Sequence, residues 1–413
     1  MAVTVDNEEL NGAEQVVDQR TKRNVAALFT AQAIGGAQLP INMTFAPLIG
    51  AALADDPRNA TLPISVMVLA VMLTSPVASM VMERIGRKAG FLIGCAVGAV
   101  GGVLAIIATL QSSFLMFLFG IALIGSYQAH QNLYRFAATD TAPDFFKPKA
   151  IAWVLGGGLV AAILGPPLAA WTKDMLLPVP LAGAYIAVVV VNVAAALPLL
   201  ALDIPKPEPV AKSAEGTSEG RSLVEIFRQP DAMVALLCGM VSYALMTLMM
   251  TSTSTAMVLC GHSETQAVTV VGFHVIAMFG PSFFTGNLIT RFGVLPIIFT
   301  GLLLTAASGV VAAHDVTLGH FYVSLILLGL GWNFGFIGAS SLLALSHRPE
   351  ERARVQGFND FCVFGLVALA SLASGRIMHA SGWATITLVM VPFLILSALS
   401  LAWLAGVKRR AQG

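Results

Sequence analysis

The chain alternates between long apolar runs and short polar clusters. Twelve runs are long enough to cross the hydrocarbon core of a bilayer, which takes about 20 apolar residues in a helix. Their apolar positions are continuous rather than alternating, which favours helices over the strands of a membrane barrel. The pattern therefore predicts an all-α membrane protein with twelve transmembrane helices. The runs lie near residues 25–50, 61–82, 89–110, 113–136, 149–172, 181–203, 231–259, 266–290, 294–313, 318–344, 355–378 and 384–406.

Composition supports lipid as the solvent of this chain. Hydrophobic residues make up 57% of the sequence and charged residues 11%, whereas soluble domains carry about 25% charged residues. The net charge of +1 gives no reason to expect a nucleic-acid partner. The spacing of the four cysteines, Cys95, Cys238, Cys260 and Cys362, is not that of a metal site. We therefore expect neither a metal nor a cofactor.

The distribution of basic residues predicts the orientation of the chain. The first residues are acidic and do not form a secretory signal. If they stay in the cytosol, twenty of the 23 Lys and Arg residues fall on the cytosolic side, and only Arg58, Lys173 and Arg376 fall outside. Such a bias orients membrane proteins strongly. We expect a multi-pass protein of a bacterial inner membrane with both termini in the cytoplasm.

A polar segment divides the chain into two halves. Residues 205–222 are rich in Pro, Lys, Glu, Ser and Gly, a composition typical of flexible linkers, and six predicted spans lie on each side. The predicted organisation is a cytoplasmic tail at 1–23, a six-helix bundle at 24–204, a cytoplasmic linker at 205–230, a second six-helix bundle at 231–406 and a cytoplasmic tail at 407–413.

An internal repeat relates the two halves. The loop after the second span runs from Ser79 to Lys88, and a similar loop after the eighth span runs from Gly286 to Gly293. Ser79 and Gly86 each lie 207 residues before their counterparts, Gly286 and Gly293. A shared offset of half the chain indicates duplication, as in transporters whose halves rock about a central site. The two bundles are therefore expected to be pseudo-symmetric.

The loop Ser79-x-x-x-Glu83-Arg84-Ile-Gly86-Arg87-Lys88 resembles a signature of the major facilitator superfamily, Gly-x-x-x-Asp-Arg-x-Gly-Arg-Arg. With twelve spans and a central linker, the resemblance covers essentially the whole chain. It implies a secondary transporter that works by alternating access. It also implies that Glu83, Arg84 and Arg87 latch the halves together, with Glu83 meeting the start of helix eleven or Arg354. Alternatively, the basic residues only enforce topology.

The same resemblance implies that spans one, four, seven and ten line a central cavity. Tyr127 and Phe334 share the repeat offset, so they are expected to form two aromatic walls. Neutral amides without a buried Arg or Lys at mid-depth suit a largely uncharged planar solute. Packing between helices is the alternative for each residue. The candidate substrate-binding residues are Gln38, Asn42, Tyr127, Gln128, Gln131, Met249, Thr251, Trp332, Asn333, Phe334 and Phe336.

Coupling to protons requires a titratable group within the membrane. Asp360, His274 and His130 are the candidates, and proton-linked transport and facilitated diffusion both stay open. Asp360 is near enough to the predicted cytosolic surface to pair with Arg354. Arg135 and Asp140, at the inner end of the fourth span, form either a cytoplasmic gate or a group that reaches the lipid headgroups.

Riboflavin importers also belong to this superfamily, and an aromatic, amide-rich cavity would suit an isoalloxazine ring. The prediction is a monomer that imports a vitamin-like aromatic compound such as riboflavin. A proton-linked exporter of drugs or metabolites is the first alternative, supported by Gly165 and Pro166, which resemble an antiporter motif. A membrane sensor or enzyme is less favoured, because the chain contains no His-x-x-x-His, Cys-x-x-Cys or Gly-x-Ser-x-Gly motif.

Overall fold

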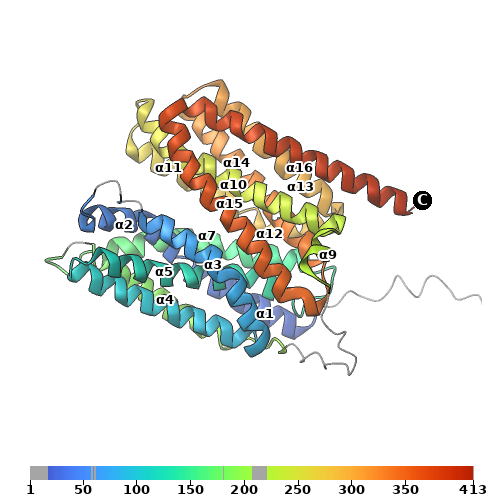
Figure 1. The fold of residues 1–413 in the computed structure, drawn as a ribbon, viewed down its shortest axis with the longest axis horizontal. Helices are drawn as coiled ribbons and strands as arrows, with labels where there is room; N and C mark the ends of the chain where they lie inside the picture. Colours follow the sequence, from blue (N-terminus) through green and yellow to red (C-terminus); the bar gives the residue numbers. More distant parts are fainter. Residues whose placement is uncertain (1–16, 57–58, 60–61, 180, 207–220, 413) are drawn as a thin grey trace, which may run out of the picture.

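A computed structural model describes residues 17–56, 59, 62–179, 181–206 and 221–412. Within these ranges the regular elements are helices, and they form two bundles that lie side by side (Figure 1). The first half contains α1 (Gln19–Gly35), α2 (Gln38–Leu53), α3 (Leu62–Ile85), α4 (Arg87–Leu110), α5 (Phe114–Asn132), α6 (Tyr134–Ala137), α7 (Lys147–Thr172) and α8 (Ala184–Leu199).

The second half begins with a short helix that follows the linker. It contains α9 (Leu223–Phe227), α10 (Pro230–Leu259), α11 (Glu264–Phe279), α12 (Ser282–Phe292), α13 (Val294–His314), α14 (Leu318–Ala344), a 3-10 turn (Pro349–Glu351), α15 (Arg352–Ser381) and α16 (Trp383–Gln412). The greater part of the predicted linker, residues 207–220, and the acidic residues 1–16 lie outside the described residues.

Each predicted span coincides with a helical segment, although not always with one unbroken helix. Among the described residues, eight helices are long and apolar enough to cross a membrane, and α11 with α12 forms a ninth span bent by 40°. The first predicted span is divided between α1 and α2, the fourth is α5, and the sixth is the shorter apolar helix α8. The predicted tails are partly helical, since α1 begins at Gln19 and α16 extends to Gln412.

Two glycines carry the repeat into the backbone. Gly86 precedes α4 with φ 92° and ψ 156°, and Gly293 precedes α13 with φ 87° and ψ 160°. Positive φ strains residues that have a Cβ, so glycine suits both tight connections. The same turn therefore recurs at the offset of 207 residues, which supports the internal duplication.

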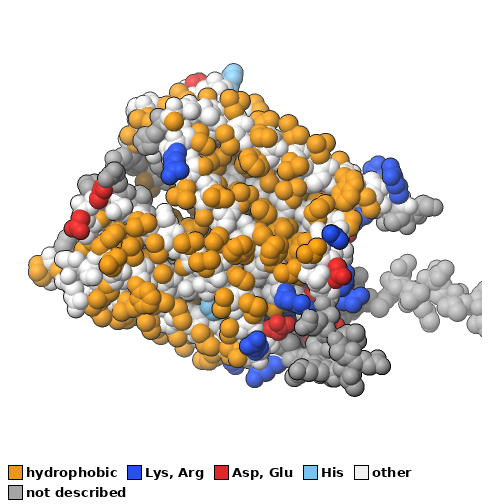
Figure 2. Space-filling model, in the orientation of Figure 1, with side chains coloured by type: hydrophobic (Ala, Val, Ile, Leu, Met, Phe, Trp, Pro, Cys, Tyr) orange, Lys and Arg blue, Asp and Glu red, His pale blue; other side chains and the backbone are white. Residues whose placement is uncertain are grey.

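The two ends of the bundle differ in charge. The linker end carries Asp203, Arg221 and the start of α1, and the opposite end, called the open end below, carries Leu53 and Leu259. Most charged side chains visible in Figure 2 lie at the linker end, while apolar side chains cover the flanks of the helices. An apolar flank between polar ends is the surface that a bilayer requires.

The halves touch at the linker end and separate toward the open end. On α15, a Cβ added at Gly357 would lie 2.8 Å from the Cα of Pro76 in α3, so the helices are in close contact there. Gly375 follows about five turns later on the same face of α15. A Cβ at Gly375 would meet no atom within 4 Å.

The second contact between the halves shows the same divergence. A Cβ at Gly286 in α12 would lie 2.5 Å from the Cα of Lys149 in α7, and Phe279 of α11 is equally close to Gly158. Gly272 lies about two turns before Phe279 on the same face of α11, and a Cβ there would meet nothing within 4 Å. In Figure 1 the two bundles accordingly splay apart toward α2 and α11.

Candidate functional site

One face of α15 makes the polar contacts that close the linker end. Arg352, Gln356 and Asp360 recur every four residues, so they lie along one side of the helix. Each contacts a side chain of the first half: Arg352 binds Asp140, Gln356 accepts a hydrogen bond from Arg87, and Asp360 binds Arg135. This stripe aligns three contacts between the halves along the first turns of α15.

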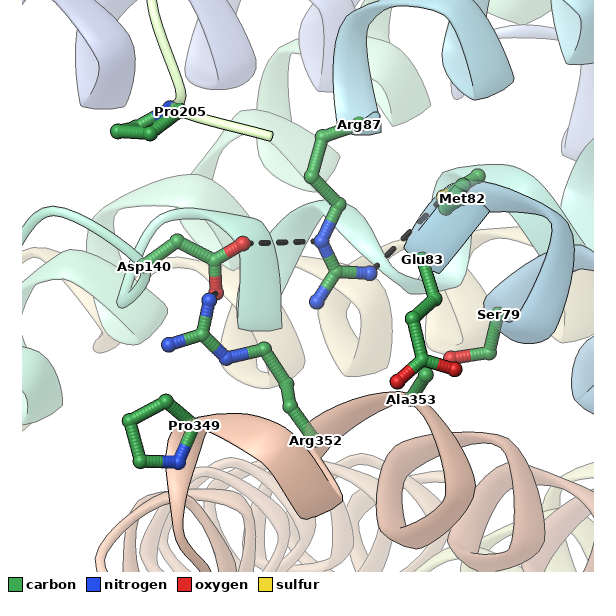
Figure 3. A pocket seen from close by; sticks show the side chains of 9 residues that line it. All are labelled: Ser79, Met82, Glu83, Arg87, Asp140, Pro205, Pro349, Arg352 and Ala353. Atoms are coloured by element: carbon green, nitrogen blue, oxygen red, sulfur yellow. Dashed lines mark hydrogen bonds and ion pairs between the residues drawn. The ribbon is translucent and has the colours of Figure 1, made fainter. Parts of the chain in front are cut away.

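Asp140 is shared by two arginines, one from each half (Figure 3). Arg87 Nε donates to Asp140 Oδ2 at 2.9 Å, and Arg352 Nη1 lies 3.0 Å from Asp140 Oδ1. The predicted pairing of Asp140 with Arg135 is therefore wrong. In sequence the two residues are close, but the chain turns after α6 and carries Asp140 toward α4 and α15.

Arg135 instead forms a buried ion pair with Asp360. Its Nη2 lies 2.5 Å from Asp360 Oδ1, and the two side chains are 2% and 0% exposed. Arg135 also donates to the carbonyl of Asn132, and Asn359 donates to Asp360. The expected pairing of Asp360 with Arg354 is replaced by this contact.

The latch residues of the loop between α3 and α4 occupy different positions. Glu83 is half-buried and points at the first turn of α15, beside Ala353, in the pocket that also holds Arg87 and Asp140 (Figure 3). Arg84 is exposed. Of the two positions expected for Glu83, the structure places it at the start of helix eleven.

A histidine adjoins this network outside the membrane-spanning segments. The pKa of His347 is lowered from 6.5 to about 4, mainly because the ring is removed from water, with the positive charges of Arg352 and Lys147 adding to the effect. The neutral form of His347 is thus favoured in this conformation. His347 was not among the residues predicted from the sequence.

Five aromatic side chains of the second half cluster at the junction with Arg135. We call them the aromatic floor: Tyr243, Phe279, Trp332, Phe336 and Phe364. Trp332 stacks on Phe336 with centroids 5.1 Å apart, and Tyr243 lies within 5.5 Å of both rings and of Phe364. The Arg135 guanidinium lies 4.9 Å from the centroid of Phe336. The floor therefore contacts the buried ion pair directly.

Two floor residues, Trp332 and Phe336, were among the predicted substrate-binding residues. The prediction that Tyr127 and Phe334 form two aromatic walls of one cavity is wrong. Tyr127 is fully buried inside the first bundle, with its hydroxyl against Gly35. Phe334 packs on a separate apolar cluster around Ile151 and Ile289. The repeat offset gave the two residues equivalent positions along their helices, but those positions do not face a shared chamber.

The predicted amides divide into two groups. Gln128 is half-buried, and its Nε2 donates to Asn132 Oδ1 at 3.2 Å. Gln128 and Asn132 precede Arg135 by seven and three residues, so all three share the helix face toward the second half. Gln38, Asn42 and Gln131 are buried within the first bundle near the break between α1 and α2.

The remaining candidates hold helices together in this structure. Asn333 donates to the carbonyl of Met278 and to Ser282, and accepts from Thr285, so it spans the bend between α11 and α12. His274 Nδ1 contacts the carbonyl of Leu325, and His130 Nδ1 contacts that of Ser126. Met249 is fully buried. Of the three coupling candidates, Asp360 contacts the other half of the protein.

The exposed face of α10 carries hydroxyl groups. Thr251, Ser254 and Thr255 are exposed on this helix, and we call them the hydroxyl stripe. Thr251 donates to Ser374 of α15 at 2.8 Å. Of the three, Thr251 was predicted as a binding residue. Among the described residues, no group of three or more His, Cys, Asp or Glu side chains is placed to bind a metal ion.

Two pseudo-symmetric helical halves, closed by ion pairs at one end and separated at the other, define a membrane transporter. Comparison with known proteins identifies the family. The chain matches the Major Facilitator Superfamily over residues 28–362 and 261–413, and it belongs to that superfamily. The prediction of a secondary transporter, rather than an enzyme, is confirmed by this membership.

Relatives and solved structures extend the comparison. The chain is 43% identical over 375 residues to the riboflavin transporter RfnT of Brucella anthropi, covering 91% of this chain and 94% of that protein. It is 27% identical over 398 residues to the uncharacterized transporter YddS of Bacillus subtilis, covering 92% and 91%. The structure of the transporter FucP in the outward conformation superposes with a TM-score of 0.76 at 15% identity, covering 92% and 98%.

Proposed function

We propose that this chain imports riboflavin, or a closely similar flavin, across the bacterial cytoplasmic membrane by alternating access. The observation that carries the proposal is the 43% identity to a riboflavin transporter along nearly the full length of both chains. The alignment covers 91% of this chain and 94% of that protein.

The aromatic floor supports a planar aromatic solute. Tyr243 and Phe279 are half-buried at the base of the separated halves, and they pack on Trp332 and Phe336, which are buried behind them. Planar rings gain both apolar burial and stacking against such side chains. The one cation in contact with the floor, among the described residues, is Arg135, and its charge is neutralised by Asp360. This neutral, aromatic environment suits an uncharged flavin better than a sugar phosphate or a dicarboxylate.

The distribution of basic residues supports a cytoplasmic linker end. Arg87, Arg135, Arg221 and Arg352 all lie there, together with the start of α1 and the end of α16. Positive charge near the ends of spans favours the cytoplasmic side. The open end then faces the periplasm, so the described conformation is the one that receives a solute from outside. A single chain contains both halves, so a monomer suffices.

Alternating access then requires the linker end to open. The three contacts of the α15 stripe, at Arg352, Gln356 and Asp360, would have to break, and the open end would close around the solute. Asp360 is our candidate for proton coupling, because it is the membrane-embedded carboxylate that joins the two halves. Arg87, Asp140 and Glu83 form the remainder of the proposed gate.

Growth of a riboflavin-requiring bacterium tests the proposal. The strain should lack both riboflavin synthesis and its own importer, and should be supplied with riboflavin at limiting concentrations. Expression of this chain is expected to restore growth and raise intracellular flavin. Phe336→Ala should abolish the rescue, whereas Phe119→Ala, at a side chain that is 60% exposed on α5, should retain it. An unchanged riboflavin requirement would overturn the proposal, and a fall in intracellular flavin would indicate export instead.

A further inference from the structure

The helix α10 presents a stripe that changes in chemistry along its length. Tyr243, Thr247, Thr251 and Thr255 recur every four residues, so they form a row that winds slowly around the helix from the linker end toward the open end. Thr247 is the buried member of this row. Tyr243 is half-buried and packs into the aromatic floor. Thr251, Ser254 and Thr255 are exposed. The face is thus aromatic at its base and hydroxylated above.

This face lines the space between the halves rather than the lipid surface. α10 is among the most buried of the spans and packs against α11, α14, α15 and α16 of its own half. The side chains exposed on the outer helix α16, such as Leu388, Ile395 and Leu399, are apolar as lipid requires. A stripe of three hydroxyls on an inner helix is instead suited to a water-filled cleft. The surface in Figure 2 is hollowed between the halves at the open end.

The first half places an amide at the same depth. Arg135 and Tyr243 both contact Phe336, so the two residues mark the level of the floor on α5–α6 and on α10. Gln128 lies seven residues beyond Arg135, and Thr251 eight residues beyond Tyr243, both toward the open end. Each is therefore about 10–12 Å above the floor along its helix. Gln128 and the hydroxyl stripe form a polar level above the aromatic one.

Two of the stripe hydroxyls have their hydrogen-bonding capacity free for a solute. Within the described part of the chain, the side chains of Ser254 and Thr255 make no hydrogen bond to protein groups. The Thr251 hydroxyl donates to the Thr247 carbonyl or to Ser374, while its oxygen can still accept. Exposed hydroxyls above an aromatic base match a solute with a planar ring at one end and a polyhydroxyl chain at the other.

Resting on the function proposed above, we infer that a flavin binds ring first. The isoalloxazine ring lies against Tyr243 and Phe279, which are backed by Trp332 and Phe336. The polyhydroxyl chain points toward the open end, between Gln128 and the hydroxyl stripe. The opposite orientation would press hydroxyl groups against aromatic rings, where they lose hydrogen bonds to water without replacement. The ring-first orientation keeps each hydroxyl beside water or a polar side chain.

Binding of two flavins to the purified full-length protein tests this orientation. Riboflavin carries the polyhydroxyl chain, while lumiflavin has the same ring with a methyl group in its place. The variant Thr251→Val/Thr255→Val removes two hydroxyls with little change in shape. Fluorescence titration should show a Kd for riboflavin roughly tenfold higher, as expected for the loss of two ordinary hydrogen bonds. The Kd for lumiflavin should change by less than about twofold, because the methyl group makes no such bond.

Matched variants separate the possible outcomes. Thr253→Val, at a buried threonine on the opposite face of α10 that donates to the Met249 carbonyl, should leave the ratio of the two Kd values unchanged. Gln128→Met should reproduce the selective loss from the other half, which keeps the test valid if the double variant misfolds. Tyr243→Leu should weaken both flavins equally.

Equal weakening of riboflavin and lumiflavin by the hydroxyl variants, or no weakening of either, would overturn the orientation while leaving riboflavin import in place. Failure of the unmodified protein to bind riboflavin would overturn the proposed function, and the orientation with it.

Discussion

Replacing Asp360 by Asn should shift the conformational equilibrium of the transporter toward an open linker end. The Asp360–Arg135 pair joins the halves, and its side chains are 0% and 2% exposed. Removing one partner of a buried ion pair costs about 3–5 kcal/mol, because the other charge is left unpaired away from water. In the open state Arg135 would be hydrated, so most of this cost applies to the closed state alone.

A penalty of 3 kcal/mol changes a two-state equilibrium by more than about 100-fold. The shift should fall short of the upper value, because Arg87, Asp140 and Arg352 still hold the linker end. The double variant Arg135→Met/Asp360→Leu removes both charges, and apolar replacements of a whole buried pair are often neutral. It should therefore return the equilibrium toward that of the unmodified protein.

Cysteine labelling at the two ends measures this equilibrium. In a background without native cysteines, Ser79→Cys reports on the linker end, where Ser79 is fully buried against α15, and Thr255→Cys reports on the open end, where Thr255 is exposed. With Asp360→Asn, maleimide should label position 79 at least tenfold faster and position 255 more slowly. Unchanged rates at both positions, in protein that remains monodisperse, would refute a role for this pair in closing the linker end.

Three further predictions follow from the contacts between the halves. In a flavin uptake assay, Gly286→Val should abolish uptake, because its Cβ would lie 2.5 Å from Lys149 Cα and prevent closure of the linker end. Gly272→Val should retain uptake in the same assay, because a Cβ there meets nothing within 4 Å. The pKa of His347 is about 4 in the closed state and should return toward the ordinary 6.5 when the linker end opens. Acidification from pH 7.5 to about 5.5 should thus favour opening of the linker end. The measurement is the ratio of maleimide labelling rates at positions 79 and 255, and His347→Gln should remove the pH effect. Glu83→Gln should slow flavin uptake roughly two- to fivefold without changing the amount of protein in the membrane, because a carboxylate at a helix start contributes about 0.3–1 kcal/mol; an unchanged rate would exclude the latch role.

The helical architecture could be predicted from sequence because hydropathy and spacing are local properties of the chain. A bilayer requires apolar runs of set length, and the duplicated turns at Gly86 and Gly293 require glycine in each copy. The break between α1 and α2 was not predicted. Its region contains Gly35 and Gly36, and an apolar run by itself does not show that a helix is interrupted there.

The ion pairs could not be predicted, because they depend on how distant segments meet. Arg135 and Asp360 are 225 residues apart, and no local pattern links them. Proximity in sequence favoured Arg135 with Asp140, which the turn after α6 separates. Tyr243 and Phe364 were missed for a related reason. Aromatic residues are common in apolar runs, and the place of these two in the floor becomes apparent only when α10, α14 and α15 pack together.

Counterflow in liposomes tests the central claim most directly, that this chain carries riboflavin through a site that opens to one side at a time. Liposomes containing the purified protein are loaded with unlabelled riboflavin and diluted into a trace of labelled riboflavin, with no ion gradient. Exchange through one alternating site predicts a transient accumulation of label above the outside concentration, abolished by Gly286→Val. Label that never exceeds the level in protein-free liposomes would contradict the account.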